Sequence, residues 1–180
     1  WQASLKRQKQ VYKHNQHFEN MLNNLLMQMP AREKPFRKPV EKDTKIVIVA
    51  VGSERGLCGR FNYAVSEYLT KYLTGQVDSG AQPEVWGLGS RLARLLVRGP
   101  IPIAQIHSLS VTALPQYYAA FNMTRLWLER YEIYEVDRVD VLYNAYRGTG
   151  HYEPGVVHLV PPHFAVDHVM PEKDMVWPTP

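Results

Sequence analysis

The chain has 180 residues, of which 45% are hydrophobic and 21% are charged, and its formal net charge at pH 7 is +4. This composition is typical of one globular domain and excludes a membrane-spanning segment, because no run of about 18 apolar residues occurs. The single cysteine excludes an internal disulfide and favours a reducing compartment. The mild basic excess has no aromatic-studded pattern, so solvated basic faces are favoured over a nucleic-acid partner.

Residues 1–30 have the pattern of an amphipathic helix that Pro30 ends. Apolar side chains recur at steps of three, four or seven residues and form one seam: Val11, Phe18, Leu22, Leu25 and Met29. The seam predicts either packing on the chain's own sheet or a coiled-coil partner. Residues 31–43 contain two prolines and many charges and predict an extended linker, so an α/β domain is expected over 44–180.

The run from Ile46 to Val51 is short, continuous and β-branched, which predicts a buried central strand of a parallel sheet. A turn with glycines at 52, 56 and 59 follows, and then a helix is expected from Phe61 to Leu73, with Gly75 as its stop signal. The glycine spacing matches neither the dinucleotide fingerprint nor the P-loop, so no phosphate-binding motif is identified in this turn.

The remaining elements alternate. We expect a strand over 83–88, a helix over 91–97, a strand over 100–107, a helix capped by Ser110 or Thr112 that ends near Glu132, and strands over 138–146 and 155–160. The prolines of the 100–107 strand place it at a sheet edge or lie near its beginning. Only eight residues separate the last two strands, so they should pair antiparallel. The fold class expected is a three-layer, Rossmann-like α/β domain, with a mostly parallel sheet and one antiparallel strand, preceded by the amphipathic coiled-coil-type helix.

The sequence offers weak candidates for chemistry. Cys58 lies on a glycine turn before a helix, where a thiol nucleophile could be activated, with His107 as the best-placed base; the alternative is a small residue that packs the turn. His158, His163 and His168 are spaced by five, but on a strand this spacing points neighbours to opposite faces. We therefore expect no metal site, no cofactor and no catalytic residue.

The run Ser53-Glu54-Arg55-Gly56-Leu57-Cys58-Gly59, with Asn62 after it, resembles the signature of the gamma subunit of F-type ATP synthases, the rotor shaft. The resemblance is collinear over most of the chain. Residues 84–91, 139–146 and 154–161 are similar to three further strands of that family, while the end of the chain resembles the family pattern imperfectly.

This resemblance implies a central rotor-shaft subunit that couples proton or sodium flow through the membrane ring to ATP synthesis or hydrolysis in the alpha–beta hexamer, with no catalytic site of its own. The implied partners are alpha and beta subunits, an epsilon-type subunit and the membrane c-ring. The implied location is peripheral, on the soluble (cytoplasmic or matrix) side of an energy-coupling membrane, with the bacterial cytoplasmic membrane favoured. Residues 1–30 would be the end of the long N-terminal shaft helix.

The resemblance also implies a subunit interface. Arg55 matches the family's motif arginine, which would meet an acidic segment of the beta subunits, while Gly56, Leu57, Cys58 and Gly59 would shape the turn. Alternatively, Arg55 only closes its own turn by bonding Glu54 or backbone. Two residues depart from the family pattern: Arg60 replaces a small residue, and Glu67 replaces a common lysine.

These departures keep two other interpretations open. One is a divergent gamma-like subunit of an atypical ATPase. The other is a small α/β nucleotide-binding module or enzyme that shares only the fold.

Overall fold

The structure is a computed structural model, and it describes residues 13, 43–56, 58–109, 117–148 and 151–161. The described residues from 43 onward belong to one compact unit. Apart from residue 13, the expected N-terminal helix with its seam lies outside the described residues, as does almost all of the expected linker. Among the described residues, no helix combines the length and apolar character that crossing a membrane would require.

The sheet has five strands in the order β3-β2-β1-β4-β5. Their bounds are β1 Lys45–Val51, β2 Gln82–Leu88, β3 Gln105–His107, β4 Arg138–Gly148 and β5 His151–Val160. The central strand β1 pairs in parallel with β2 and β4, and β3 extends the parallel sheet beyond β2. The last strand, β5, pairs antiparallel with β4. The expected mixed sheet is thus confirmed, including its single antiparallel pair.

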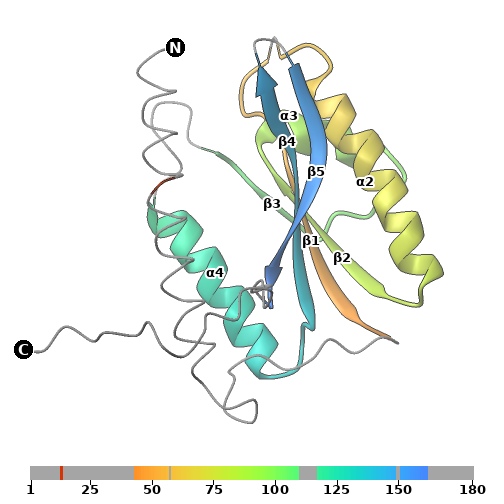
Figure 1. The fold of residues 1–180 in the computed structure, drawn as a ribbon, viewed down its shortest axis with the longest axis vertical. Coiled ribbons are helices and arrows are strands. Elements are labelled where there is room, and N and C mark those ends of the chain that lie inside the picture. Colours follow the sequence, from red (N-terminus) through yellow and green to blue (C-terminus); the bar gives the residue numbers. More distant parts are fainter. Residues whose placement is uncertain (1–12, 14–42, 57, 110–116, 149–150, 162–180) are drawn as a thin grey trace, which may run out of the picture. The chain divides into compact units, whose positions relative to one another are not determined.

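Helices cover both faces of this sheet (Figure 1). Helices α2 (Phe61–Asp78) and α3 (Ser90–Val97) pack on one face, and α4 (Tyr117–Glu132) lies on the other. Alternate residues of β1 supply both interfaces: Ile46 and Ile48 join the core beneath α2 and α3, while Val47 and Val49 are equally buried on the opposite side. A continuous apolar run therefore becomes the central strand because both of its faces are covered.

Helix α4 is attached to β2 by an ion pair. Arg130 donates to both carboxylate oxygens of Glu84, at 3.3 Å and 2.7 Å, and the indole of Trp86 donates to Glu84 at 2.6 Å. Trp86 also packs on Trp127 of α4, with ring centroids 5.8 Å apart. Burial raises the pKa of Glu84, but the hydrogen bonds from Arg130 and Trp86 and the arginine charge outweigh it, so the net shift is downward.

Several element boundaries differ from those expected. Helix α2 continues through Gly75 to Asp78, and the chain turns at Gly80, which has φ +83°. An exposed glycine inside a helix costs only about 1 kcal/mol, so it did not end the helix.

Strand β3 starts at Gln105 rather than at residue 100, because Pro100 and Pro102 have no amide hydrogen to donate. Its place at the sheet edge is confirmed, while Ser110 and Thr112 lie outside the described residues.

A buried carboxylate joins α2 to the last two strands. Asp140 on β4 is fully buried and accepts hydrogen bonds from the Tyr72 hydroxyl and from Arg138 Nε, both at 2.8 Å. His158 Nδ1 on β5 lies 2.6 Å from its other oxygen. Burial and the Asp140 charge raise the pKa of Tyr72 far above its ordinary value. Of the three evenly spaced histidines, His158 is thus a partner of Asp140, and His163 and His168 lie outside the described residues.

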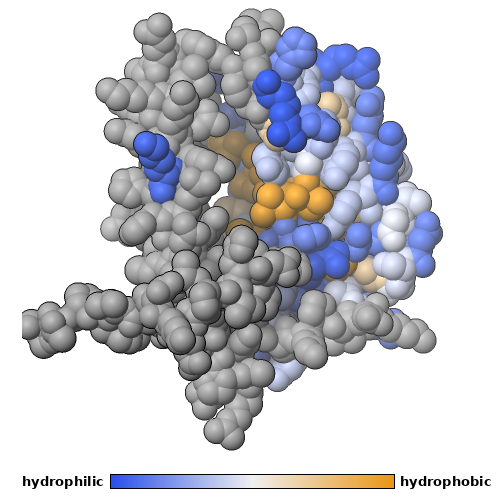
Figure 2. Space-filling model, in the orientation of Figure 1, coloured by the Kyte–Doolittle hydropathy of each residue, from blue (hydrophilic) through white to orange (hydrophobic). Residues whose placement is uncertain are grey.

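The part of the surface that Figure 2 colours is mostly hydrophilic, with a small apolar area in the part of the view that β5 occupies in Figure 1. Val157 and Leu159 of β5 are 44% and 37% exposed and contribute apolar surface. A small apolar area of this kind is normal on the surface of a globular domain.

Candidate functional site

The glycine-rich signature begins with a close approach between β1 and α3. Gly52 donates its amide hydrogen to the Leu88 carbonyl at 2.8 Å. A Cβ at Gly52 would lie 2.3 Å from the Leu92 Cβ and 2.6 Å from Asn62 Oδ1, so only glycine fits. Asn62 then accepts from the Ser53 amide at 2.9 Å and donates to the Ser53 hydroxyl at 2.8 Å. The two ends of the signature are therefore bonded to each other.

Glu54, in the segment after β1, is hydrogen-bonded to the segments that follow β2 and β3. Its carboxylate accepts hydrogen bonds from the Ser90 amide and the Leu109 amide, both at 2.9 Å, and from the Ser90 hydroxyl. The hydroxyl and amide of Ser90, then the amide of Leu109, hold the pKa of Glu54 below its ordinary value. Ser90 begins α3, so Glu54 acts as a cap supplied from a distant segment.

Backbone bonds complete this edge of the sheet. The Arg91 amide donates to the Ser53 carbonyl at 3.0 Å, and the Gly89 amide donates to the His107 carbonyl at 2.8 Å. The segments that follow β1, β2 and β3 are therefore one hydrogen-bonded unit. Sequence reasoning missed the roles of Glu54 and Asn62. Asn62 lies near the start of α2, where an amide side chain is a recognisable capping signal. Glu54 caps a helix that begins 36 positions later, and no local pattern indicates that.

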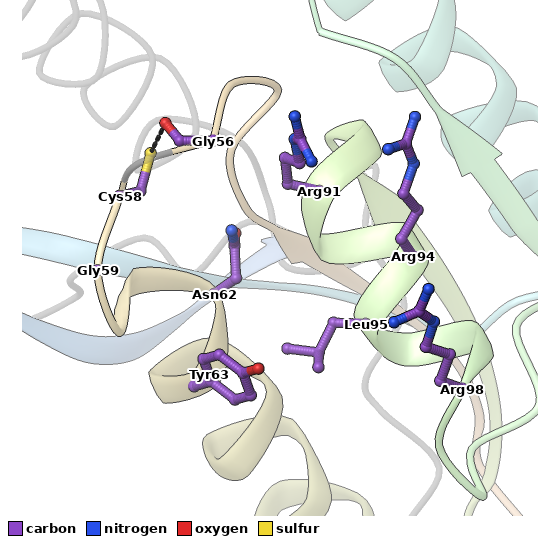
Figure 3. A pocket seen from close by; sticks show the side chains of 9 residues that line it. All are labelled: Gly56, Cys58, Gly59, Asn62, Tyr63, Arg91, Arg94, Leu95 and Arg98. Carbon is purple, nitrogen blue, oxygen red and sulfur yellow. Dashed lines mark hydrogen bonds between the residues drawn. The ribbon is translucent and has the colours of Figure 1, made fainter.

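The predicted interface residues do lie together on one loop. Arg55 and Gly56 are exposed, Gly59 is exposed, and Cys58 is half-buried. The Cys58 thiol lies 3.3 Å from the Arg55 carbonyl and 3.4 Å from the Gly56 carbonyl, and the second contact is drawn in Figure 3. Leu57 lies outside the described residues. The loop therefore presents an arginine from a turn whose base is firmly held by Ser53 and Glu54.

The structure gives Cys58 and His107 different partners. The thiol faces the two carbonyl oxygens of its own turn. The His107 ring packs on Trp86, with centroids 5.4 Å apart, and its Nε2 lies 3.1 Å from Gln105 Oε1. These contacts favour the packing interpretation of Cys58 over that of a nucleophile with a histidine base.

A cavity of about 460 Å³ separates this loop from α3. The loop and the first turn of α2 line one side, and basic side chains line the other (Figure 3); the lining residues are Gly56, Cys58, Gly59, Asn62, Tyr63, Arg91, Arg94, Leu95 and Arg98. The sequence analysis did not identify the three arginines as members of a site. Their spacing of three and four residues on a helix is the signal that could have revealed them.

The two residues that depart from the family pattern contact each other. Arg60 Nη2 lies 3.2 Å from Glu67 Oε1, and both side chains are mostly exposed. An exposed pair of this kind contributes at most about 1 kcal/mol. The glutamate charge is therefore balanced within the chain.

Comparisons with known proteins agree on one family. A family model described as ATP synthase matches residues 2–177. The ATP synthase gamma chain of Anaeromyxobacter dehalogenans is 27% identical over 146 residues, covering 79% of this chain and 50% of the relative. That of Nitrosospira multiformis is 24% identical over 163 residues, covering 88% and 55%. The chain thus spans about half the length of the curated relatives it matches.

The fold is also similar to that of a chain in the central stalk and c-ring structure of the Tetrahymena thermophila mitochondrial ATP synthase. The TM-score is 0.51 at 14% identity, with 87% of this chain and 71% of that chain covered. A similarity at this identity establishes the fold.

Proposed function

Because the chain belongs to the ATP synthase gamma family, we propose that it is the central rotor-shaft subunit of a rotary F-type ATP synthase. In this role it couples proton or sodium flow through the membrane ring to ATP synthesis or hydrolysis in the alpha–beta hexamer. It has no catalytic site of its own. The observation that carries the proposal is the family match over residues 2–177, together with the intact run from Ser53 to Gly59.

The mechanical requirement of a rotor is a body that transmits torque without deforming. Glu54 supports this role because it bonds Ser90 and Leu109 and so links the ends of strands far apart in sequence. The Arg130–Glu84 pair similarly attaches α4 to the sheet, with an Nη2 to Oε2 distance of 2.7 Å. A densely packed interior has low compressibility and transmits strain.

The partners follow from the role. We expect alpha and beta subunits around the shaft, an epsilon-type subunit and the c-ring of the membrane sector. The protein would be peripheral, on the soluble side of an energy-coupling membrane, and the bacterial cytoplasmic membrane is favoured. The domain division expected from the sequence belongs to this proposal: a shaft helix over 1–30, a linker over 31–43 and the α/β domain over 44–180.

The proposed shaft contact is a coiled coil. Val11, Phe18, Leu22, Leu25 and Met29 repeat at the spacing that places apolar residues on one seam. In a chain that continues beyond residue 180, a C-terminal helix with a matching seam would cover them.

The proposed contact with the hexamer is the exposed turn, formed by Arg55, Gly56, Leu57, Cys58 and Gly59. An arginine on a rigid turn suits a charge-assisted bond to a carboxylate of the beta subunits, since its guanidinium can donate two parallel hydrogen bonds. The base of the turn is fixed by Ser53, whose hydroxyl donates to the Arg55 carbonyl at 2.9 Å.

A divergent gamma-like subunit of an atypical ATPase is the second candidate. The Arg60–Glu67 pair favours it, because a common lysine position carries an acid that is bonded within the chain. A beta subunit with an altered charge pattern would be the matching partner.

Co-expression of the full-length gene with alpha and beta subunits tests the proposal. The tagged protein should co-purify with both subunits, and ATP hydrolysis should depend on its presence. Standard alpha and beta subunits should be compared with those of any atypical ATPase operon in the same genome. Failure of every pair to assemble would reject both candidates and favour the module that shares only the fold.

A further inference from the structure

We propose that the cavity between α3 and the turn at residues 56–59 binds an anion that carries two or more phosphate groups. Its basic wall is formed by Arg91 and Arg94 of α3 and by Arg98, which directly follows the helix (Figure 3). A phosphate site of this kind goes beyond the rotor function and does not depend on it.

The spacing of the arginines predicts the length of the ligand. Residues three and seven positions apart lie within one sector of a helix, and the rise from Arg91 to Arg98 is about 10 Å. One phosphate group is too small to contact a row of this length. A chain of two or three phosphates can contact neighbouring guanidiniums at the same time, each through forked hydrogen bonds.

The charge of this row is not neutralised inside the described part of the chain. Five other described arginines pair with a carboxylate within 4 Å, namely Arg60, Arg125, Arg130, Arg138 and Arg147. No described carboxylate makes such a pair with Arg91, Arg94 or Arg98. Glu54 is close enough for Arg94 to lower its pKa, but its oxygens accept bonds from Ser90 and Leu109. Three like charges on one helix face favour a polyanion as their partner.

The opposite wall gives the cavity the dimensions of a small-molecule site. Gly56 lies so close to Arg91 that a Cβ there would be 3.4 Å from the guanidinium, so the turn closes one end of the row. Tyr63 and Leu95 add an aromatic and an aliphatic side chain to the lining. The volume of about 460 Å³ lies within the range of about 300–1,000 Å³ that small ligands occupy.

The phosphate would be held by side chains rather than by a helix start. The first amides of α3 are already used, since Ser90 donates to Glu54 and Arg91 donates to the Ser53 carbonyl. A glycine fingerprint is therefore unnecessary, which agrees with its absence from the turn.

Isothermal titration of the full-length protein with pyrophosphate, tripolyphosphate, ADP and AMP tests the site. We expect saturable binding of pyrophosphate, tripolyphosphate and ADP, with one site per chain. The affinity for AMP should be lower by at least about tenfold. The combined variant Arg91→Gln, Arg94→Gln and Arg98→Gln should lose at least about tenfold in affinity for pyrophosphate. The matched control removes the same charge from exposed arginines elsewhere, as Arg60→Gln, Arg125→Gln and Arg147→Gln, and should bind as the unmodified protein does.

The ligands also separate two sources of the phosphate chain. Equal affinity for pyrophosphate and ADP would mean that the protein contacts only the phosphates. Tighter binding of ADP would mean that it also contacts the nucleoside, with Tyr63 as the residue that stacks on the base. Binding of neither pyrophosphate nor tripolyphosphate would overturn the proposal, as would full binding by the α3 variant. Binding of an acidic peptide in their place would equally overturn it. Thermal melting of each variant, followed by circular dichroism, establishes that a loss of binding is not a loss of folding. The single variant Arg94→Gln is a milder test of the same site.

Discussion

The carboxylate of Glu54, in the turn after β1, accepts hydrogen bonds from both the amide and the hydroxyl of Ser90, the first residue of α3. The two residues are 36 positions apart in sequence. One signature side chain thereby caps a helix that its own strand does not precede. The acidic position of the signature is thus structural.

Replacing Glu54 with Gln should lower the melting temperature by a few degrees. Glutamine keeps the size of the side chain but replaces the charged acceptor and directs an amide towards the donors at Ser90 and Leu109. Thermal melting followed by circular dichroism measures the effect. Glu129→Gln, at an exposed helix position, is the matched control and should leave the melting temperature nearly unchanged. An unchanged melting temperature in Glu54→Gln would show that the cap contributes little.

The contribution of Glu54 to stability should depend on pH. In the folded state the hydrogen bonds from Ser90 and Leu109 hold the pKa of Glu54 below its ordinary value. A lowered folded pKa means that its stabilisation is complete above the unfolded pKa and is lost as the pH falls through the folded pKa. The difference in melting temperature between the unmodified protein and Glu54→Gln should therefore be constant from neutral pH to about pH 6 and shrink below about pH 4.5. A difference that grew on acidification would contradict the assignment.

Gly52→Ala should destabilise the fold by at least about 2 kcal/mol. The added Cβ would lie 2.3 Å from the Leu92 Cβ, so α3 would have to move away from β1. Urea unfolding gives the free energy. The matched control is Gly75→Ala: Gly75 lies within α2, a Cβ there meets nothing within 4 Å, and alanine should stabilise the helix by about 0.5–1 kcal/mol. Equal effects at the two positions would refute the close approach.

Asp140→Asn should cost about 2–3 kcal/mol of the free energy of unfolding. Asparagine removes the charge that faces Arg138 and His158, and it places an amide among groups arranged for a carboxylate. Urea unfolding again measures the change. Asp78→Asn, at the exposed end of α2, should change the free energy by less than about 0.5 kcal/mol. Similar values for the two variants would mean that the buried cluster does not stabilise the fold.

Arg55→Ala tests the proposed contact with the hexamer. If the rotor proposal holds, the variant should fold normally, while the assembled complex should lose coupling or hydrolysis by about tenfold, since a charge-assisted bond is worth about 1.5–3 kcal/mol. ATP hydrolysis by the purified complex is the measurement, and Arg125→Ala, exposed on α4, is the control. Full activity of Arg55→Ala would place the interface elsewhere.

Periodicity predicted the elements well where a pattern was strong. The β-branched run of β1, buried on both faces, predicted a central parallel strand, and the short link between β4 and β5 predicted their antiparallel pairing. Boundaries were less certain. Gly75 was expected to stop α2, but the helix extends one turn further because Leu69, Tyr72 and Leu73 still pack on the sheet and hold it in place.

By itself the sequence determined the order and type of the elements and the family signature, because both depend on residue spacing along the chain. Only the tertiary structure decided how the signature works. The bonds of Glu54 to Ser90 and Leu109, and the shared cavity of Cys58 with Arg91, Arg94 and Arg98, join segments separated by at least one helix and one strand. Such contacts depend on crossover geometry and side-chain direction, which local spacing does not specify.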